Sequence, residues 1–363
     1  MKLNTISMKN LGLTEEWIQE SKQYKDLFIG RVSTQSKNLF KVITEKGEMV
    51  AEISGKFHYS IKSASQYPAV GDFVMVDRTD DSQGNGMIHH ILTRKSIFAR
   101  KSAGSKEELQ VVATNIDTVF ICMSLNHDYN LRRLERYLSI AWDSGAIPVI
   151  VLTKSDLCQD IDQKLSDIAS IAIGVEVLVT TSTSDEGYQS LKRYLSNGKA
   201  VAFIGSSGVG KSTLINALLG QNRLDTNGLR NDDKGRHTTT RRELIMLPNL
   251  GVVIDTPGMR ELGIISADLT QSFADIDQLA SQCRFNDCTH KSEPNCAIQK
   301  AIKDGSLSVK RLESYWKLKK ETKYEGLNAK MIEKEKISEM FSGMGGMKNA
   351  RKFIKEQNRN KRR

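Results

Sequence analysis

The order of two motifs limits what this chain can fold into more than any other feature of its sequence. The segment GSSGVGKS, at 205–212, matches the phosphate-loop pattern G-x-x-x-x-G-K-[ST] and stands between an expected strand and an expected helix. The segment TKSD, at 153–156, follows another hydrophobic strand and has the form of a base reader. In ordinary nucleotide switches the phosphate loop comes first. The reversed order predicts a domain that has been cut and rejoined elsewhere.

The phosphate loop predicts how a nucleotide is held. Its glycines let backbone N–H groups turn toward the phosphates, and the N-terminus of the following helix adds a favourable dipole. Lys211 is expected to bridge the β and γ phosphates, and the Ser212 hydroxyl is expected to bind Mg²⁺. The complete set of predicted phosphate-binding residues is Gly205, Ser206, Ser207, Gly208, Val209, Gly210, Lys211, Ser212 and Thr213.

The TKSD segment predicts a preference for GTP over ATP. The Asp156 carboxylate can accept two hydrogen bonds, from the guanine N1–H and the 2-amino group. Adenine lacks this pair of donors and would leave a buried acceptor unpaired. Lys154 can lay its stem along the purine ring, and Thr153 supplies a hydroxyl where the usual motif carries Asn. After the next strand, Thr181 or Ser182 is expected to add a weak contact to the base.

Two later segments match the switch regions of a GTPase. The sequence DTPG begins at Asp255, which is expected to hold Mg²⁺ through water, and ends at Gly258, whose N–H is expected to touch a γ-phosphate. The polar segment GRHTTT, at 235–240, lies where switch I is expected. The residue of this loop that completes the Mg²⁺ shell is expected to be Thr238 or Thr239.

The four segments therefore occur in the order base reader, phosphate loop, switch I, switch II. From about residue 109 the hydrophobic strands alternate with amphipathic helices, which predicts a parallel sheet covered on both faces. Because domain termini often lie close together, the old ends can be joined and the chain cut elsewhere without loss of the fold. We therefore interpret this region as a circularly permuted α/β P-loop GTPase.

The catalytic residue is less directly indicated. Water-positioning GTPases often carry Gln just after the glycine of the second switch. Met259 stands at that position and cannot orient water, so slow intrinsic hydrolysis is expected. His237 in switch I is the best internal candidate, and the alternative is that it is an exposed loop histidine or an RNA contact.

The chain divides into three expected domains. Residues 1–105 hold an N-terminal extension and, at 27–98, short strands separated by turns, which predict a small antiparallel barrel. An oligonucleotide-binding (OB) fold is one candidate and another small barrel fits the same pattern. Residues 106–268 form the permuted GTPase, and residues 269–363 are expected to be helical around a zinc site, with a basic C-terminal tail.

A cluster of cysteines and a histidine predicts a metal centre in the third domain. The segment CRFNDCTHKSEPNC has the spacing C-x₄-C-x-H-x₅-C, with Cys283, Cys288, His290 and Cys296 as the ligands. Three thiolates and one imidazole form a tetrahedral zinc set, and four protein ligands leave no open position. We expect one structural zinc per chain. Free thiols or a disulfide are the alternatives, and a disulfide is disfavoured in a cytosolic chain.

The charge of the chain is concentrated at its C-terminal end. The net charge is +10, and residues 310–363 carry 17 Lys and Arg against 7 Asp and Glu, so residues 1–309 are formally neutral. Such basic tails commonly meet nucleic acid, and a solvated helical face is the alternative.

Taken together, these motifs resemble the ribosome small-subunit-dependent GTPase A family. The resemblance covers about residues 27–320 and combines the permuted motif order with the zinc spacing. It implies a bacterial factor that binds the small ribosomal subunit and its rRNA late in maturation and hydrolyses GTP to GDP there, with Mg²⁺. The sequence adds its own support for RNA, because a small barrel, a zinc module and a basic tail flank the GTPase; the alternative is that these parts contact protein.

Two other functions are compatible with parts of the sequence. A non-catalytic RNA-binding module with a regulatory or vestigial nucleotide site would not need Lys211, Ser212, Asp156 and Asp255 together. A P-loop kinase of a small metabolite would not need TKSD. The start of the chain lacks the pattern of a signal peptide, and no stretch approaches the roughly 18 apolar residues of a membrane span, so a cytoplasmic monomer without a membrane partner is expected.

Overall fold

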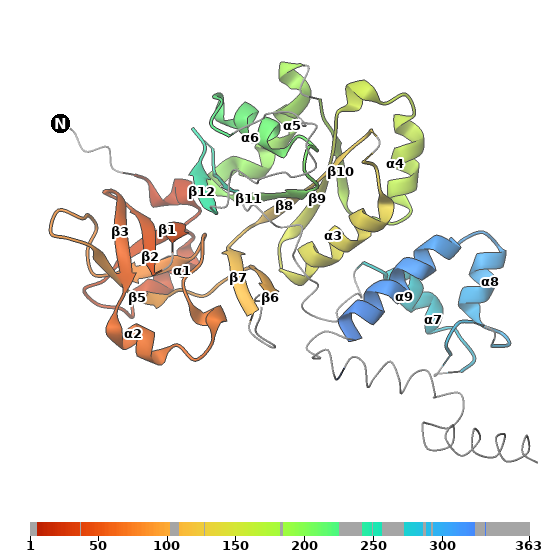
Figure 1. The fold of residues 1–363 in the computed structure, drawn as a ribbon, viewed down its shortest axis with the longest axis horizontal. Helices are drawn as coiled ribbons and strands as arrows, with labels where there is room; N and C mark the ends of the chain where they lie inside the picture. Colours follow the sequence, from red (N-terminus) through yellow and green to blue (C-terminus); the bar gives the residue numbers. More distant parts are fainter. Residues whose placement is uncertain are drawn as a thin grey trace, which may run out of the picture.

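A computed structural model describes residues 6–36, 38–101, 109–126, 128–181, 184–224, 242–248, 250–255, 272–285, 288–291, 293–323 and 331. An N-terminal β-barrel comes first, a sheet with helices on both faces follows, and a group of helices ends the described chain (Figure 1). The barrel and the C-terminal helices lie on opposite sides of the central domain (Figure 1). No helix in these described ranges is long and apolar enough to span a membrane.

The N-terminal domain is a closed barrel of five strands. Their bounds are β1 (Phe28–Ser36), β2 (Leu39–Thr44), β3 (Gly47–Ile53), β4 (Phe73–Val76) and β5 (Gly86–Ile91). The strands pair in the order β1-β2-β3-β5-β4, and β4 closes the barrel by pairing with β1. The helix α2 (Gly55–Ser60) connects β3 toward β4. The small barrel expected from the sequence is confirmed as OB-like, but it is not antiparallel throughout, because β3 and β5 pair in parallel.

Five parallel strands form the centre of the GTPase sheet. They are β8 (Thr118–Ser124), β9 (Ile147–Thr153), β10 (Glu176–Val179), β11 (Ala200–Gly205) and β13 (Val252–Asp255). They pair in the order β10-β9-β8-β11-β13. The predicted parallel sheet is confirmed, but it continues into an antiparallel strand, β12 (Glu243–Met246), that the sequence reading missed.

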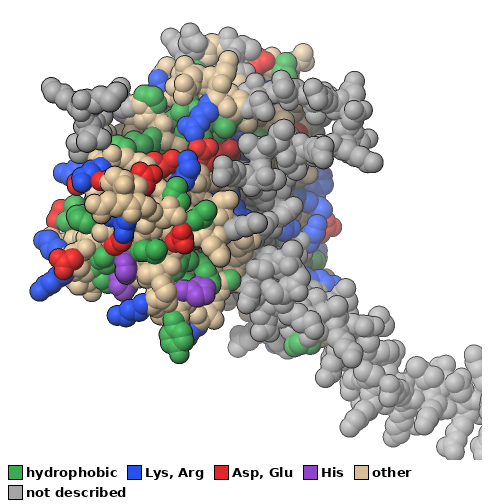
Figure 2. Space-filling view, turned by 60° about the vertical axis from the view of Figure 1, so that its left-hand side comes forward, with side chains coloured by type: hydrophobic (Ala, Val, Ile, Leu, Met, Phe, Trp, Pro, Cys, Tyr) green, Lys and Arg blue, Asp and Glu red, His purple; other side chains and the backbone are tan. Residues whose placement is uncertain are grey.

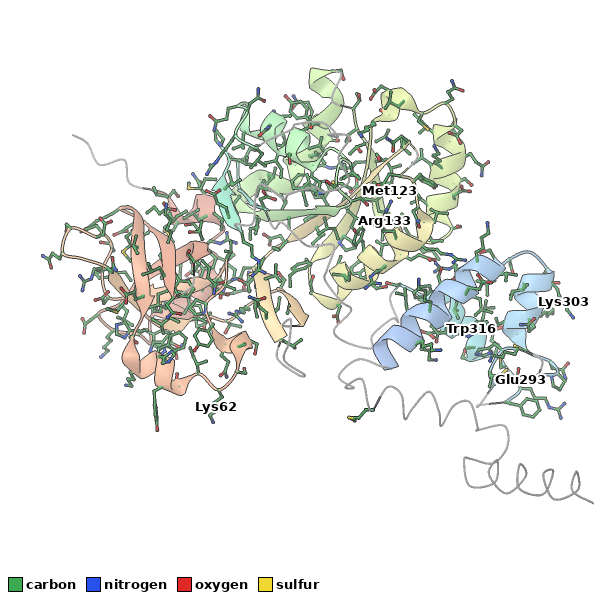
Figure 3. All side chains as sticks on the ribbon, in the orientation of Figure 1. Lys62, Met123, Arg133, Glu293, Lys303 and Trp316 are labelled. Carbon is green, nitrogen blue, oxygen red and sulfur yellow. The ribbon has the colours of Figure 1, made fainter. Side chains whose placement is uncertain are left out.

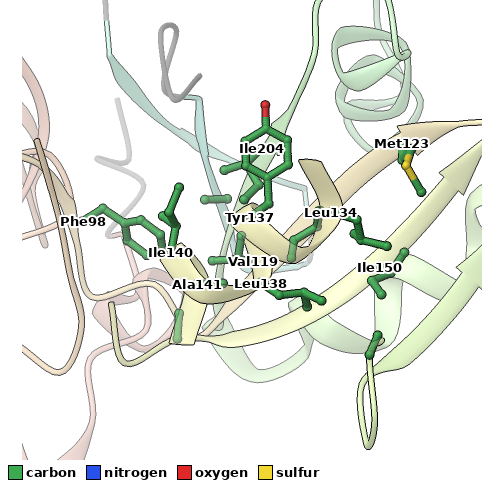
Figure 4. Packing of buried hydrophobic residues seen from close by; sticks show 14 of the residues in the cluster. Phe98, Val119, Met123, Leu134, Tyr137, Leu138, Ile140, Ala141, Ile150 and Ile204 are labelled. Carbon is green, nitrogen blue, oxygen red and sulfur yellow. The ribbon is translucent and has the colours of Figure 1, made fainter. Parts of the chain in front are cut away.

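Helices cover both faces of this sheet because successive strand side chains point to opposite sides. The helices α3 (Leu131–Asp143) and α4 (Ile161–Ala169) pack on one face, and α5 (Gln189–Lys192) and α6 (Lys211–Leu219) pack on the other. On the α3 face, residues of the helix meet strand residues (Figure 4); the contacting set includes Leu134, Leu138, Val119, Ile150 and Ile204.

Local sequence sets the limits of α3. The Asn130 side chain accepts a hydrogen bond from the Arg133 backbone N–H at 3.0 Å and so satisfies one of the first free donors of the helix. The chain leaves the helix at Gly145, whose φ of 82° lies in the left-handed region that glycine adopts without strain.

One sheet runs from the GTPase into the barrel. β12 pairs with β13 on one side and with β1 on the other, where Thr34 lies opposite Glu243. The result is an 11-stranded sheet that spans both domains. A separate antiparallel hairpin, β6 (Ile97–Lys101) and β7 (Leu109–Thr114), lies between the barrel and the central helices (Figure 1).

The C-terminal part is helical, as expected. Its helices are α7 (Ala274–Ala280), α8 (Ala297–Lys303) and α9 (Val309–Lys323). Trp316 on α9 packs against the main core and lies between α9 and the other C-terminal helices (Figure 3). Beyond residue 323, the basic C-terminal tail lies outside the described residues except for Met331. The remaining short elements are α1 (Glu15–Ser21), η1 (Met8–Leu11), η2 (Ala64–Gln66), η3 (Ser155–Leu157), η4 (Asp185–Tyr188) and η5 (Arg193–Gly198).

Candidate nucleotide site and metal centre

The phosphate loop lies where the sequence predicted, between β11 and α6. Gly208 and Gly210 have φ values of 74° and 99°, which a residue with a side chain rarely adopts. Gly205 ends β11 so close to β8 that a Cβ would lie 2.3 Å from the Cys122 carbonyl oxygen. These positions require glycine because of backbone shape and close approach, and the resulting turn directs the chain into the N-terminus of α6.

Lys211 is held by the loop itself. Its Nζ donates to the carbonyl oxygens of Gly205 at 2.9 Å and Ser206 at 2.6 Å. The ammonium group therefore lies over the phosphate loop, and Ser212 and Thr213 follow it in the first turn of α6. A phosphate oxygen carries more negative charge than a carbonyl, so it is the stronger acceptor for this group.

Asp255 lies at the C-terminal end of β13, next to β11. Burial raises the pKa of its carboxyl group; Lys211 opposes the shift, and Glu243, its neighbour across the β12–β13 ladder, adds to it. A hydroxyl at Ser212 and a carboxylate at Asp255 are hard oxygen donors of the kind that Mg²⁺ prefers. The chemistry of these donors therefore fits a magnesium ion carried with a nucleotide.

The base-reader segment contacts the phosphate loop directly. The Thr153 hydroxyl donates to the Val209 carbonyl oxygen, and Lys154 Nζ donates to the Gly208 carbonyl oxygen at 2.7 Å. Lys154 has a φ of 57°, a left-handed conformation at the turn out of β9. Two motifs in permuted sequence order thus form one connected surface, because β9 and β11 lie on either side of β8.

Asp156 is exposed beside this surface and has an orienting partner. The Thr181 hydroxyl donates to Asp156 Oδ1 at 2.7 Å. Thr181 follows β10, which pairs with β9, so the sheet sets this contact. Of the two residues expected near the base, Thr181 therefore touches the base reader, and Ser182 lies outside the described residues.

Apart from Asp255, the predicted switch residues are not among those that the structure describes. The predicted positions of His237, Thr238 and Thr239 in switch I, and of Gly258 and Met259 in switch II, lie outside the described residues. Their assignments stay predictions.

The predicted zinc ligands converge on one point. The ligand atoms of Cys283, Cys288, His290 and Cys296 all lie within 4.8 Å of one another. Cys283 Sγ is 3.9 Å from Cys296 Sγ, and His290 Nδ1 is 3.6 Å and 3.5 Å from these two sulfurs. Zinc–sulfur bonds of about 2.3 Å at tetrahedral angles place two sulfurs about 3.8 Å apart. The residues therefore fit a zinc ion.

Backbone and side-chain hydrogen bonds hold these ligands in place. Cys296 is the N-cap of α8, and its Sγ accepts from the Gln299 backbone N–H at 3.5 Å. The Gln299 side chain returns to donate to the His290 carbonyl oxygen at 2.6 Å. Burial, together with the Cys296 and Cys283 sulfurs, raises the pKa of the Cys288 thiol to about 11. A cation bound between the ligands would offset the repulsion between the thiolates and so lower the pKa of this thiol.

A buried ion cluster joins the C-terminal helices to the GTPase domain, and sequence reasoning missed it. Arg311 on α9 donates to Glu135 on α3 at 2.8 Å and forms a two-pronged pair with Asp275 on α7 at 2.7 Å. It also donates to the Ser272 carbonyl oxygen at 3.0 Å. No local sequence pattern predicts this cluster, because each of its charged residues alone resembles an ordinary charged position on a helix.

The connected phosphate loop and base reader, on a parallel sheet with permuted strand order, define a circularly permuted P-loop GTPase. The RsgA GTPase family model matches residues 91–265. A Lactiplantibacillus plantarum protein named small ribosomal subunit biogenesis GTPase RsgA 2 is 50% identical over 345 residues, covering 95% of this chain and 97% of that protein. The corresponding RsgA 1 of Listeria innocua is 43% identical and covers 87% of this chain and 90% of its own length. This chain belongs to the RsgA family.

The relationship extends to solved structures and to an archaeal protein. The RsgA protein of Methanosarcina acetivorans is 42% identical over 337 residues, covering 91% of this chain and 90% of that protein. The crystal structure of YjeQ from Thermotoga maritima superposes with a TM-score of 0.61 at 28% identity, covering 82% of this chain and 98% of that one. YloQ, described as a circularly permuted GTPase, has a TM-score of 0.58 at 24% identity and supports the fold, covering 83% of this chain and 96% of that one.

Proposed function

We propose that this protein binds GTP, hydrolyses it to GDP and phosphate, and does so on the small ribosomal subunit late in its maturation. The observation that carries the proposal is the bonding of Thr153 and Lys154 to the phosphate loop. These bonds connect the segment proposed to bind the base with the segment proposed to bind the phosphates. The relatives are named for small-subunit biogenesis, which supports the choice of partner.

In the proposed complex, the phosphates lie on the loop 205–213 and the guanine lies against Lys154 and Asp156. Lys211 would leave its two carbonyl partners for the β and γ phosphates, because charge-assisted hydrogen bonds are the stronger ones. Ser212 and Asp255 would hold Mg²⁺, which supplies charge neutralisation to the phosphates. Gly258 and Thr238 or Thr239 are the further proposed contacts.

Hydrolysis is proposed to depend on the partner. Met259 offers no group that could orient a water molecule, so the isolated protein is expected to turn over slowly. We propose that His237 orients the attacking water when the subunit holds switch I. The experiment is GTP turnover with and without purified small subunits, on wild type and His237→Ala. Stimulation should fall by about 100-fold in the variant while GTP binding stays. Absence of any stimulation in the wild type would favour an RNA-binding module with a vestigial site.

Guanine selection is proposed to rest on Asp156. The Asp156→Asn variant should bind GTP more weakly and xanthosine triphosphate better, because the 2-oxo group of xanthine accepts a hydrogen bond that an amide can donate. Competition binding with GTP, ATP and xanthosine triphosphate measures this change. Equal affinity of the wild type for ATP and GTP would exclude the assignment.

Release from the subunit is proposed to follow hydrolysis. Switch II leads from Asp255 toward Ser272, whose carbonyl oxygen is bound by Arg311 of the C-terminal domain. A γ-phosphate that orders switch II would therefore act on the C-terminal domain. Tenfold tighter subunit binding with a GTP analogue than with GDP needs only about 1.4 kcal/mol of coupling. Equal subunit affinities with GDP, GTP analogue and no nucleotide, at one salt concentration, would refute this route.

The remaining parts of the chain have supporting roles in the proposal. We assign residues 1–105 to the barrel, 106–268 to the GTPase and 269–363 to the zinc domain and basic tail. One structural zinc per chain would hold the third domain together. The barrel, the zinc domain and the tail would contact rRNA. The protein would act in the cytoplasm as a monomer.

A further inference from the structure

One side of the barrel carries aromatic rings and positive charges that the nucleotide site does not use. The segment 54–68, which contains α2, has two lysines and four aromatic or imidazole side chains and no Asp or Glu. Figure 2 shows His side chains beside hydrophobic and Lys or Arg side chains toward the lower edge of this face. We call the following residues the α2 patch: Lys56, His58, Tyr59, Lys62, Tyr67 and His90.

Tyr59 is the most exposed member of the patch. Its side chain is 94% exposed, although it stands on a short helix of the folded barrel. Single exposed hydrophobic residues are common on protein surfaces and by themselves indicate nothing. Here, however, Lys56 precedes Tyr59 by three residues on the same helix and so shares its face, and Lys62 lies at the lower end of the barrel (Figure 3).

The neighbouring rings are held in fixed orientations. The His90 ring stacks on Tyr24 with centroids 4.3 Å apart and planes 27° apart. His58 and Tyr67 meet edge to face at 6.0 Å, and their Nδ1 and hydroxyl groups are 3.4 Å apart. Burial, together with the positive charges of His89 and Lys56, lowers the pKa of His90. The rings are therefore ordered before any partner binds, which lowers the entropy cost of binding.

We propose that the α2 patch binds unpaired nucleotides of RNA, with Tyr59 stacking on a base and Lys56 and Lys62 contacting phosphates. Aromatic rings stack on every base, and lysines follow the negative backbone, so this combination fits a single strand better than an acidic or apolar protein surface. The proposal rests on the proposed ribosomal function and names the part of the barrel that would contact rRNA.

The test compares variants of the full-length protein with two probes. The first probe is a fluorescent single-stranded RNA of mixed sequence and the second is the purified small subunit. Tyr59→Ala should weaken both affinities about tenfold or more, for the loss of one stacked base, and Tyr59→Phe should stay within about twofold. The Lys56→Ala/Lys62→Ala double variant should lower the slope of log affinity against log salt by about 1.4 for the single strand. Lys46→Ala, at a lysine paired with Asp80, is the control.

Each outcome is decisive. Unchanged binding of both probes by Tyr59→Ala and the double lysine variant overturns the proposal. Weaker subunit binding with unchanged RNA binding also overturns it, because the patch would then contact a ribosomal protein. A failure of the proposed ribosomal function would be detected separately: small subunits would then not stimulate GTP turnover by the wild-type protein. Unchanged thermal unfolding of the variants shows that the barrel has stayed folded.

Discussion

Two buried arginines join the GTPase domain to its neighbours, and they are satisfied in opposite ways. Arg31 lies between the barrel and the GTPase and donates only to backbone carbonyl oxygens, those of Gly71 at 3.2 Å, Asn115 at 3.1 Å, and Leu11. These carbonyls come from the barrel, the GTPase and the N-terminal extension. Burial lowers the pKa of Arg31 to about 10, although nearby carboxylates oppose the shift.

Arg311 on the other side has carboxylates as partners. Burial lowers the pKa of Arg311, but the hydrogen bonds and charges of Asp275 and Glu135 outweigh it, and the net shift is upward. Glu135 lies on α3 of the GTPase and Asp275 lies on the C-terminal α7. The Arg311–Glu135 pair therefore joins the two domains through side chains, and apolar residues of α3 and α9, such as Leu134 and Leu312, belong to one buried core cluster beside it.

This difference indicates which of the two junctions can separate while the domains stay folded. The carbonyl oxygens that bind Arg31 stay in place as long as their three backbone segments stay folded. The β1–β12 ladder joins the same two domains. The barrel junction is thus part of the folded sheet. The C-terminal junction consists of ionic and apolar side-chain contacts, so it can separate without unfolding either helix, at the cost of exposing both kinds of group to water. We expect the C-terminal junction to be the separable one, which agrees with the proposed action of switch II on that domain.

Removing zinc should give the largest effect and should act on one junction alone. Structural zinc sites contribute apparent binding free energies of about 10 kcal/mol or more to folding. Chelation or Cys288→Ala should therefore open residues 272–323 to hydrogen exchange, while the barrel stays protected and nucleotide binding remains. Zinc analysis should find one ion per chain. Cys158→Ala, at a thiol outside the cluster, is the control, and a metal-free protein with full protection would contradict the expectation.

Arg31→Met should be the most damaging single substitution at either junction. It removes three hydrogen bonds and takes this donor from the carbonyl oxygens of Leu11 and Asn115, while the Gly71 oxygen keeps the Asn115 side-chain amide. At about 1–3 kcal/mol for each oxygen without a donor, a loss of roughly 4 kcal/mol is expected. Urea unfolding measures it. Arg78→Met, at a half-buried arginine of the barrel that pairs with its neighbour Asp77, should cost under about 1 kcal/mol. A loss below about 1 kcal/mol for Arg31→Met would show that the junction does not depend on this side chain.

Arg311→Met should cost about 3 kcal/mol and should loosen only the C-terminal domain, because it leaves Glu135 buried without its partner. The Glu135→Leu/Arg311→Met double variant should recover at least half of the loss, since both charges are then gone. Arg132→Met removes the exposed pair with Glu313 at the same interface and should cost under about 0.5 kcal/mol. Full additivity of the two buried substitutions would mean that the residues do not interact.

The pH dependence of the C-terminal junction should give the smallest effect. Burial raises the pKa of Glu135, and Arg311 opposes the shift without cancelling it. A carboxyl whose folded pKa is raised contributes stability that is fully present below its unfolded pKa and is lost as the pH rises through the folded pKa. Wild type should therefore lose stability relative to Glu135→Gln as the pH rises through this range. The opposite trend would show that the ion pair, rather than burial, dominates this carboxyl.

The motifs with local spacing were predictable from the sequence. The phosphate loop, TKSD and the C-x₄-C-x-H-x₅-C cluster each place their functional groups within a few residues of one another, so spacing alone defines the chemistry. Their order also predicted the permutation, because each motif must follow a particular strand. The sequence indicated Thr181 or Ser182 only as a weak contact to the base. The contact between Thr181 and Asp156 was not predicted, since it depends on the register of β10 against β9.

Only the tertiary structure decided how the domains are joined. Arg311 and Glu135 are 176 residues apart in the chain, and no local pattern links them. β12 is four residues long and becomes a strand because β13 and β1 lie on its two sides. Arg31 lies in β1, whose sequence has the pattern of an ordinary barrel strand. Its burial results from packing against the GTPase. The sequence by itself determined the chemistry of each site, because residues close together in the chain create it. The junctions between domains were decided by the tertiary structure, because they join segments that are far apart in the chain and meet only in the folded molecule.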